Sequence, residues 1–298
     1  MAKAIGFSHG AKIGYALGGG GARGLSHIGV IKVLEEHDIY PDFIAGTSIG
    51  ALVGALYASG LRADDIEREM RLGLRHLARL ADFRLSFNGL IQGKRVAAAL
   101  EPFLGGLTFA DLEIPFACVA TDILHGQQIV IRSGPVINAV RASISVPGLF
   151  TPVKVRGRYL VDGGLVNMVP VSTCRDLGAD YVVGVNVIPD PAGLIHELHT
   201  LRPANDEGNE EDEQDVGFQR SGSKKSKAPK SRAPNMVKVL IQSLYIPGYR
   251  IAKANLESAD LAISLEVGNI GFLQFDKVVE AIEAGEKATR KALKEAGL

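Results

Sequence analysis

Three short motifs carry the residues whose types and spacing could perform chemistry. They are a glycine run that ends in arginine (GGGGARG, residues 18–24), the pentapeptide GTSIG centred on Ser48, and DGG beginning at Asp162. Together they would supply backbone N–H donors for an oxyanion, a nucleophilic hydroxyl and a carboxylate base. This combination indicates acyl transfer from a serine.

Two segments match the pattern G-x-S-x-G, one centred on Ser8 and one on Ser48. A nucleophile elbow needs a strand before the serine, a helix after it, and small neighbours that allow a strained backbone. Ser48 has this setting, because a predicted strand at 41–45 precedes it and an apolar, alanine-rich segment at 49–59 follows it. Ser8 has neither, and we interpret residues 1–10 as a disordered N-terminal lead. Ser48 is the predicted nucleophile, and its elbow comprises Gly46, Thr47, Ile49 and Gly50.

The glycine run has three interpretations. Gly19, Gly21 and Gly24 satisfy G-x-G-x-x-G, the dinucleotide fingerprint, which also requires an acidic residue at the end of a second strand. Asp42 lies near the required distance, but it begins its segment, so we disfavour a nucleotide site. The run could also be a plain tight turn, or its N–H groups at a helix N-terminus could hold an oxyanion that only glycines let approach closely. We favour an oxyanion hole, with predicted members Gly19, Gly20, Gly21, Ala22, Arg23 and Gly24.

Arg23 lies within this loop, and two roles are open for its side chain. Its charge could lie near the oxyanion or near a phosphate head group of the substrate. Alternatively, it could stand at the start of the following helix and pair with a surface carboxylate. The sequence favours neither role over the other.

Asp162 follows a short predicted strand at 158–161 and precedes Gly163 and Gly164, which let the chain turn sharply. A carboxylate there could reach the Ser48 hydroxyl, although an ordinary D-G turn explains the same residues equally well. No histidine offers a better base, because none follows the serine, acid, histidine order of an α/β-hydrolase in a suitable setting. The seven histidines are His9, His27, His37, His76, His125, His196 and His199.

The order GGGARG, GTSIG and DGG closely resembles the patatin-like phospholipases, particularly their compact bacterial members. Two further segments strengthen the resemblance, residues 120–122 (ATD) and residues 141–153 (RASISVPGLFTPV). The similarity covers about residues 11–190 and resumes at about residue 236. It implies a serine–aspartate dyad without histidine, in which Ser48 is the nucleophile, Asp162 is the base and the glycine loop is the oxyanion hole.

These motifs need a scaffold that brings strand ends together. Short apolar runs predict strands, and apolar residues at helical spacing between several of them predict helices. We therefore expect an α/β fold of three layers, α/β/α, with a mostly parallel central sheet. The predicted strands include 13–17, 43–46, 116–120, 128–132, 158–161, 181–187 and 262–267, and the predicted helices include 25–36, 49–59, 64–83 and 275–293.

Length and composition fit one globular catalytic domain. The 298 residues are 46% hydrophobic, enough for a large core, and the formal net charge of zero gives no global field that favours nucleic acid. Cys118 and Cys174 lack metal-ligand spacing, and we interpret both as buried thiols. We expect neither a metal nor another cofactor.

No segment has the pattern of a signal peptide or of a membrane span. We expect a cytoplasmic protein whose contact with a membrane, where it occurs, is peripheral. One candidate contact surface is the segment 64–83, in which apolar residues and arginines recur on different faces. The same pattern fits a helix packed on the sheet with a solvated arginine face, and we favour this simpler interpretation.

The stretch 202–235 differs in composition from the rest of the chain. It contains seven acidic residues between Asp206 and Asp215, followed by a Ser/Lys/Pro run with almost no apolar residues. Such a composition cannot bury enough apolar surface to offset its chain entropy, so we expect disorder. Because a predicted strand and helix follow it, the stretch interrupts a single catalytic domain at 11–298. A tolerated, solvated insertion is favoured over a partner-docking loop.

The sequence thus predicts a serine acyl hydrolase acting on lipid or ester substrates, of phospholipase, lysophospholipase or carboxylesterase type. The alternative class is a regulatory or scaffold protein that keeps the fold and acts by protein binding. Intact Ser48, Asp162 and glycine loop argue against a degenerate site. Transfer of the acyl group to an alcohol other than water would use the same residues.

Overall fold

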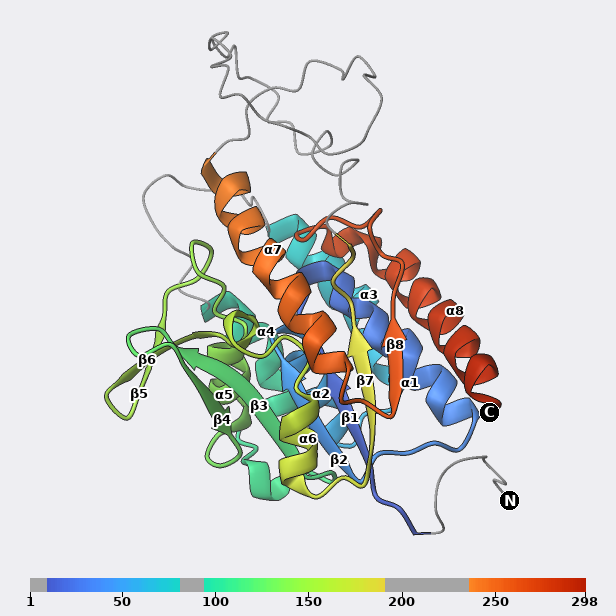
Figure 1. The fold of residues 1–298 in the computed structure, drawn as a ribbon. Coiled ribbons are helices and arrows are strands. Elements are labelled where there is room, and N and C mark those ends of the chain that lie inside the picture. The colour runs from blue at the N-terminus through green and yellow to red at the C-terminus, as the bar shows by residue number, and fades with distance from the viewer. Residues whose placement is uncertain (1–9, 81–93, 191–235) are drawn as a thin grey trace, which may run out of the picture.

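The computed structural model describes residues 10–80, 94–190 and 236–298 of the chain. Within these ranges, a mixed β-sheet lies between helices on both of its faces (Figure 1). The three-layer α/β/α arrangement expected from the sequence is confirmed. Residues 1–9 of the predicted N-terminal lead (1–10) and the whole charged stretch at 202–235 lie outside the described residues.

The described part of the chain contributes eight strands to one sheet. They are β1 (Ile13–Leu17), β2 (Phe43–Thr47), β3 (Phe116–Asp122), β4 (Gln127–Ile131), β5 (Val153–Val155), β6 (Arg158–Asp162), β7 (Tyr181–Asn186) and β8 (Leu261–Ser264). The strand order is β5-β6-β3-β2-β1-β7-β8, and β4 also pairs with β3. Strands β3, β2, β1, β7 and β8 form parallel pairs, whereas β4, β5 and β6 join through antiparallel pairs. The expected parallel centre is present, and the antiparallel strands make the sheet mixed.

Helices cover both faces of this sheet (Figure 1). They are α1 (Ser26–Glu36), α2 (Ile49–Ala58), α3 (Ala63–Leu80), α4 (Lys94–Leu104), α5 (Val136–Ser143), α6 (Val171–Leu177), α7 (Met236–Leu256) and α8 (Val278–Ala296), with 3-10 turns η1 (Gly21–Leu25), η2 (Phe109–Asp111), η3 (Gly163–Leu165) and η5 (Phe275–Lys277). Residues of α1 to α5 and α8 share one apolar cluster with the sheet, and residues of α6 and α7 share another. The sheet therefore has an apolar core on each side.

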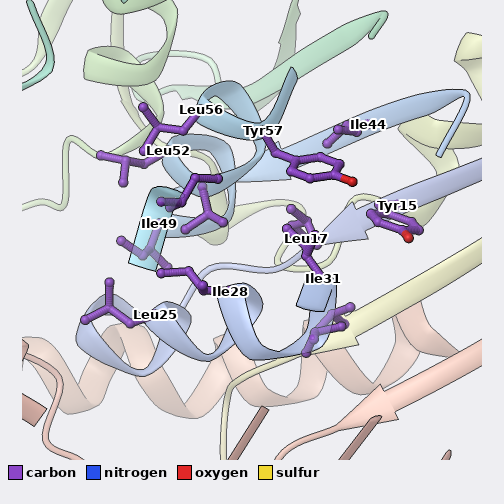
Figure 2. Close-up of a cluster of buried hydrophobic side chains, with 14 of the residues drawn as sticks. Tyr15, Leu17, Leu25, Ile28, Ile31, Ile44, Ile49, Leu52, Leu56 and Tyr57 are labelled. Atoms are coloured by element: carbon purple, nitrogen blue, oxygen red, sulfur yellow. The ribbon is translucent and has the colours of Figure 1, made fainter. Parts of the chain in front are cut away.

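Strand β1 shows how the two cores arise. Tyr15 and Leu17 belong to the larger cluster, whereas Ala16 between them belongs to the smaller one, as alternation along a strand requires. Figure 2 shows Tyr15 and Leu17 among labelled side chains of α1 and α2, including Ile28 and Leu56. Full burial of one such side chain contributes about 1.5–3 kcal/mol relative to exposure. This cluster fixes the two strand–turn–helix units that carry the first two motifs.

Helix α8 packs unusually close to α1, because glycines face each other there. A Cβ atom on Gly29 of α1 would lie 2.0 Å from Ile282 O, and one on Gly285 of α8 would lie 2.1 Å from Ser26 O. Any larger residue would push the helices apart. The C-terminal helix is thereby held against the helix that follows the glycine loop.

Every strand predicted from the sequence corresponds to an observed strand. The sequence did not predict β5, α4, α5 or α7. β5 has only three residues, too few for a pattern, and α7 begins directly after the charged stretch with a mostly apolar run.

Candidate active site

Ser48 lies in a sharp turn between β2 and α2. Its φ of 54° and ψ of −124° place it where L-residues are rarely found, which is the strain expected of a nucleophile elbow. Glycines permit this turn, since a Cβ on Gly46 would lie 2.4 Å from Ala51 Cα and one on Gly50 would lie 2.1 Å from Leu17 O. The strand, the turn and the helix predicted around Ser48 are all observed, and Ser48 itself is 6% exposed.

Asp162 reaches Ser48 from the antiparallel part of the sheet. Strand β6 ends at Asp162, which pairs with Ala120 of β3, and β3 is the parallel neighbour of β2. Ser48 Oγ donates to Asp162 Oδ2 at 2.5 Å, and Asp162 Oδ1 accepts from the Gly164 N–H at 2.8 Å. The structure therefore brings together two candidate residues that lie 114 positions apart in the sequence.

The backbone of Asp162 is held from two other elements. Its N–H donates to Ser145 O at 2.9 Å, and its carbonyl accepts from Thr121 Oγ1 at 2.8 Å. The following Gly163 packs so closely on β3 that a Cβ atom would lie 2.3 Å from Val119 O. These contacts direct the carboxylate toward Ser48, and they give Gly163 and Gly164 of the predicted dyad turn distinct tasks.

Burial raises the pKa of Asp162 from 3.8 to about 6, and the hydrogen bonds from Ser48 and Gly164 limit the rise. The carboxylate is thus ionised at neutral pH and more basic than an exposed aspartate. A general base is most effective when its pKa approaches the working pH. The site therefore contains a carboxylate suited to accept the serine proton.

The described histidines serve other contacts. His27 is fully buried, its Nε2 donates to Gly18 O at 2.8 Å, and burial lowers its pKa to about 4. The neutral ring thus holds the carbonyl at the start of the glycine loop. His37 contacts Val33 O, and His125 contacts Asp122. None of these three contacts Ser48 or Asp162, and the side chains of the others, His9, His76, His196 and His199, lie outside the described residues.

The predicted oxyanion loop runs from the end of β1 through η1, and its amides differ in availability. The Gly19 N–H donates to Met168 O at 3.0 Å, and the Ala22 N–H donates to Phe272 O at 2.9 Å. In the described part of the chain, the amides of Gly20 and Gly21 have no such acceptor, and Gly20 lines the pocket that contains Ser48. Gly20 and Gly21 are thus the loop donors that a substrate oxygen could use.

Steric fit explains why this loop is glycine-rich. A Cβ atom on Gly20 would lie 2.4 Å from Val187 Cγ2, and one on Gly21, whose φ is 61°, would lie 2.4 Å from Phe272 O. On Gly24 it would lie 2.0 Å from Ile49 Cγ2, directly beside the nucleophile. The glycines therefore let the loop and the elbow pack against each other.

The observed contacts of Arg23 match neither role that the sequence left open, a contact to the substrate or a pair with a surface carboxylate. Its side chain is 1% exposed, its Nε donates to Ile270 O at 2.6 Å, and an Nη donates to the Tyr245 hydroxyl. The guanidinium carbon also lies 4.8 Å from the centre of the Tyr245 ring. The guanidinium therefore lies inside the molecule rather than at its surface. Arg23 joins the glycine loop to α7 and to the segment before η5.

One functional contact was missed from the sequence. Ser143, at the end of α5, is fully buried; its Oγ accepts from the Ser48 N–H at 2.9 Å and donates to Val119 O at 2.6 Å. It therefore ties the strained elbow to β3. The neighbouring Ser145 bonds to the buried Arg141, whose Nη1 donates to Ser145 Oγ at 2.6 Å. The sequence indicates the segment RASISVP only through its resemblance to the family, because a hydrogen bond between Ser143 and a residue 95 positions away leaves no local pattern.

A mainly apolar pocket opens onto Ser48 and Asp162. Its walls come from the glycine loop, the segment after α5, η3 and the residues after it, the segment after β7, helix α7 and the segment before η5. The lining residues are Gly19, Gly20, Ser48, Val146, Pro147, Asp162, Gly164, Leu165, Met168, Ile188, Ile241, Leu244, Tyr245 and Phe272. Such a pocket suits an aliphatic chain next to the serine and carboxylate.

Comparison with known proteins fits this geometry. The family model described as patatin-like phospholipase matches residues 15–175, which include the glycine loop, Ser48 and Asp162. The chain belongs to the patatin-like phospholipase family. VipD from Legionella pneumophila has a related fold, with a TM-score of 0.52, 15% sequence identity, and coverage of 96% of this chain and 67% of that one.

Relatives in this family include two uncharacterized NTE family proteins of Mycobacterium tuberculosis. One is 36% identical over 61% of this chain and 51% of its own length, and the other is 31% identical over 95% of this chain and 47% of its own length. The lysophospholipase NTE1 of Scheffersomyces stipitis is 35% identical over 59% of this chain and 12% of its own length. The chain thus spans about half the length of the mycobacterial relatives.

Helix α3 contains most of the segment 64–83 that was considered for membrane contact. Where its side chains are described, at residues 63–72, it fits the simpler interpretation of a packed helix with solvated arginines. Ile66 is fully buried and Met70 packs against the core, whereas Arg68 and Arg71 are exposed and pair with carboxylates of α3 itself. The side chains of residues 73–80 are not described. Among the described residues, no helix combines the length and apolar character needed to cross a bilayer.

Proposed function

We propose that this protein is a lipolytic serine hydrolase that cleaves carboxylic esters, of phospholipase, lysophospholipase or carboxylesterase type. The observation that carries the proposal is the 2.5 Å hydrogen bond from Ser48 Oγ to Asp162 Oδ2, made from a strained elbow in an apolar pocket. Family membership and the similarity to a lysophospholipase support the same conclusion.

In the first step, Asp162 accepts the proton of Ser48 as the serine oxygen attacks the carbonyl carbon of the ester. The short hydrogen bond already aligns this transfer. Collapse of the tetrahedral intermediate expels the alcohol, which takes the proton back from Asp162. In the second step, Asp162 removes a proton from water as the water oxygen attacks the acyl-enzyme. When the bond to Ser48 Oγ breaks, the fatty acid is released and Asp162 returns the proton to the serine oxygen.

The oxyanion of each tetrahedral intermediate needs donors fixed in advance. We assign the N–H groups of Gly20 and Gly21 to this task, because they face no protein acceptor in the described chain. Removal of one such donor typically costs about 3–4 kcal/mol of transition-state stabilisation. Gly19, Ala22 and Gly24 act in support, since their backbone contacts or close packing hold the loop against Met168, Phe272 and Ile49.

Substrates of this site carry an aliphatic acyl chain. The pocket walls include Met168, Leu165, Leu244 and Phe272, which offer contacts to hydrocarbon and none to a charged head group. Arg23 does not offer a cation to the substrate, because its guanidinium is buried between Tyr245 and Ile270. The acyl chain, more than the head group, should therefore determine binding in the pocket.

Labelling with a fluorophosphonate probe, located by mass spectrometry, tests this proposal. The wild-type protein should be labelled at Ser48 and should hydrolyse a short-chain ester, and Ser48→Ala should lose both properties while retaining its circular dichroism spectrum. Ser8→Ala is the control and should behave as wild type. Absence of labelling in the folded wild-type protein would favour the alternative, a protein that keeps the fold and acts by binding.

A further inference from the structure

Helix α7 forms one wall of the pocket and also part of the molecular surface. Its residues Ile241, Leu244 and Tyr245 line the pocket, and Tyr245 bonds to Arg23 of the glycine loop. Figure 1 shows α7 lying across one face of the molecule, in front of the sheet. Helix α7 therefore lies between one side of the candidate active site and the molecular surface.

The opposite face of α7 carries a continuous stripe of exposed side chains. Positions 239, 243, 246, 250 and 253 follow each other at four- and three-residue steps, which places them on one side of a helix. Val239 is 43% exposed and Ile246 is 50% exposed, and all five positions are exposed. We call these residues the outer stripe: Val239, Ser243, Ile246, Arg250 and Lys253.

The start of α7 is mostly apolar, which is unusual for a helix at a surface. Between Met236 and Ile246, Lys238, Gln242 and Ser243 are the polar residues apart from the pocket-lining Tyr245. The apolar side chains of such a segment are stabilised when a core or lipid covers them. Leu240, beside the outer stripe, is also 38% exposed. This part of α7 thus exposes apolar side chains at the molecular surface beside the pocket.

The charge of α7 has one sign. The sequence Met236–Leu256 contains three basic residues and no acidic residue, and two of the basic residues, Arg250 and Lys253, extend the outer stripe. Apolar side chains aligned with cations complement an anionic lipid surface, which takes up the former and attracts the latter. A lipid surface is favoured over a protein partner, because the same helix lines the pocket that would receive an acyl chain.

We propose that the outer stripe of α7 docks on the surface of an anionic lipid bilayer. Docking brings the pocket beside the source of its substrate. The reason for docking rests on the proposed function, whereas docking itself does not require Ser48. Binding and hydrolysis can therefore be measured separately.

The test uses the full chain carrying Ser48→Ala, so that no lipid is consumed, and sedimentation with phosphatidylcholine vesicles with or without phosphatidylglycerol. The protein should bind the anionic vesicles more tightly. Val239→Ser with Ile246→Ser should weaken binding to anionic vesicles by about tenfold or more, given the apolar surface lost from the interface. Arg250→Gln with Lys253→Gln should weaken it by a similar factor and remove most of the preference for phosphatidylglycerol.

Val279→Ser in α8 is the matched control, because Val279 is 38% exposed on a helix that also carries carboxylates. It should bind vesicles as well as its parent. When Ser48 is present, the two outer-stripe double variants and the Val279→Ser control should each hydrolyse a soluble short-chain ester at the wild-type rate. The docking proposal would be wrong if the Val239/Ile246 variant bound vesicles as tightly as its parent, or if the parent did not bind. Neither result would contradict the proposed hydrolase function. Loss of soluble-ester turnover in that variant alone would instead assign these residues to the catalytic site.

Discussion

The two halves of the proposed dyad are held in place by different forces. Around Ser48, the elbow and the glycine loop pack closely at Gly24 and Gly50, where no Cβ atom fits, and one hydrogen bond, from the Ser48 N–H to Ser143, adds to this packing. Around Asp162, close packing is limited to Gly163, and three hydrogen bonds, from Thr121, from Gly164 and to Ser145, hold the residue. Added side-chain atoms around Ser48 should therefore lower stability and turnover. Around Asp162, turnover should depend on the carboxylate charge that the hydrogen bonds orient.

The largest effect is expected from a substitution that removes the carboxylate of Asp162 while keeping the size of the side chain. Asp162→Asn keeps the size of the side chain and can still accept from Gly164, but it cannot take the Ser48 proton. Ester turnover should fall by at least about 100-fold. The control is Asp176→Asn, at an exposed position of α6, which should retain wild-type turnover. Full activity of a folded Asp162→Asn protein would remove Asp162 from the mechanism.

A smaller effect is expected from crowding the nucleophile half. Gly24→Ala places a Cβ atom 2.0 Å from Ile49 Cγ2, so the loop and the elbow must separate. The free energy of unfolding, measured in urea, should fall by about 1–3 kcal/mol, and soluble-ester turnover should fall with it. Gly268→Ala is the matched control, because its Cβ would make only an ordinary contact at 3.7 Å. Equal stability of Gly24→Ala and wild type would show that close packing does not fix the elbow.

The smallest effect concerns the ionisation of Asp162. Because its pKa in the folded protein is about 6 and the mechanism needs the unprotonated carboxylate, turnover should fall about tenfold between pH 7 and pH 5. The raised pKa also means that the folded protein holds this proton more tightly than the unfolded chain does. Stability of wild type should thus decrease, relative to Asp162→Asn, as the pH rises from about 4 to about 6. A flat pH–rate profile across this range would place the catalytic base elsewhere.

The sequence predicted the nucleophile half more completely than the base half. The elbow at Ser48 depends on a strand, small residues and a helix that are contiguous in the chain, so its pattern was readable. Asp162 remained equally consistent with an ordinary turn until the family resemblance was considered. Its partners Thr121 and Ser145 come from β3 and from the segment after α5, and nothing local links them to it.

Arg23 is a second residue whose distant partners the sequence did not predict. Its place within the glycine loop suggested either an oxyanion contact or a surface ion pair, but its side chain is buried against Tyr245 and Ile270. Those partners lie 222 and 247 positions away, beyond the charged stretch. Helix α7, which supplies Tyr245, was itself not predicted.

The sequence by itself determined the parallel centre of the sheet, the elbow at Ser48 and the glycine loop after β1, because each follows from apolar spacing and from residues that lie together in the chain. The tertiary structure alone decided that Asp162 meets Ser48, that its pKa is raised, which loop amides have a backbone acceptor, and that α7 forms one wall of the pocket. Hydrogen-bond partners and burial depend on which distant segments the fold places side by side, and that information is absent from any short stretch of sequence.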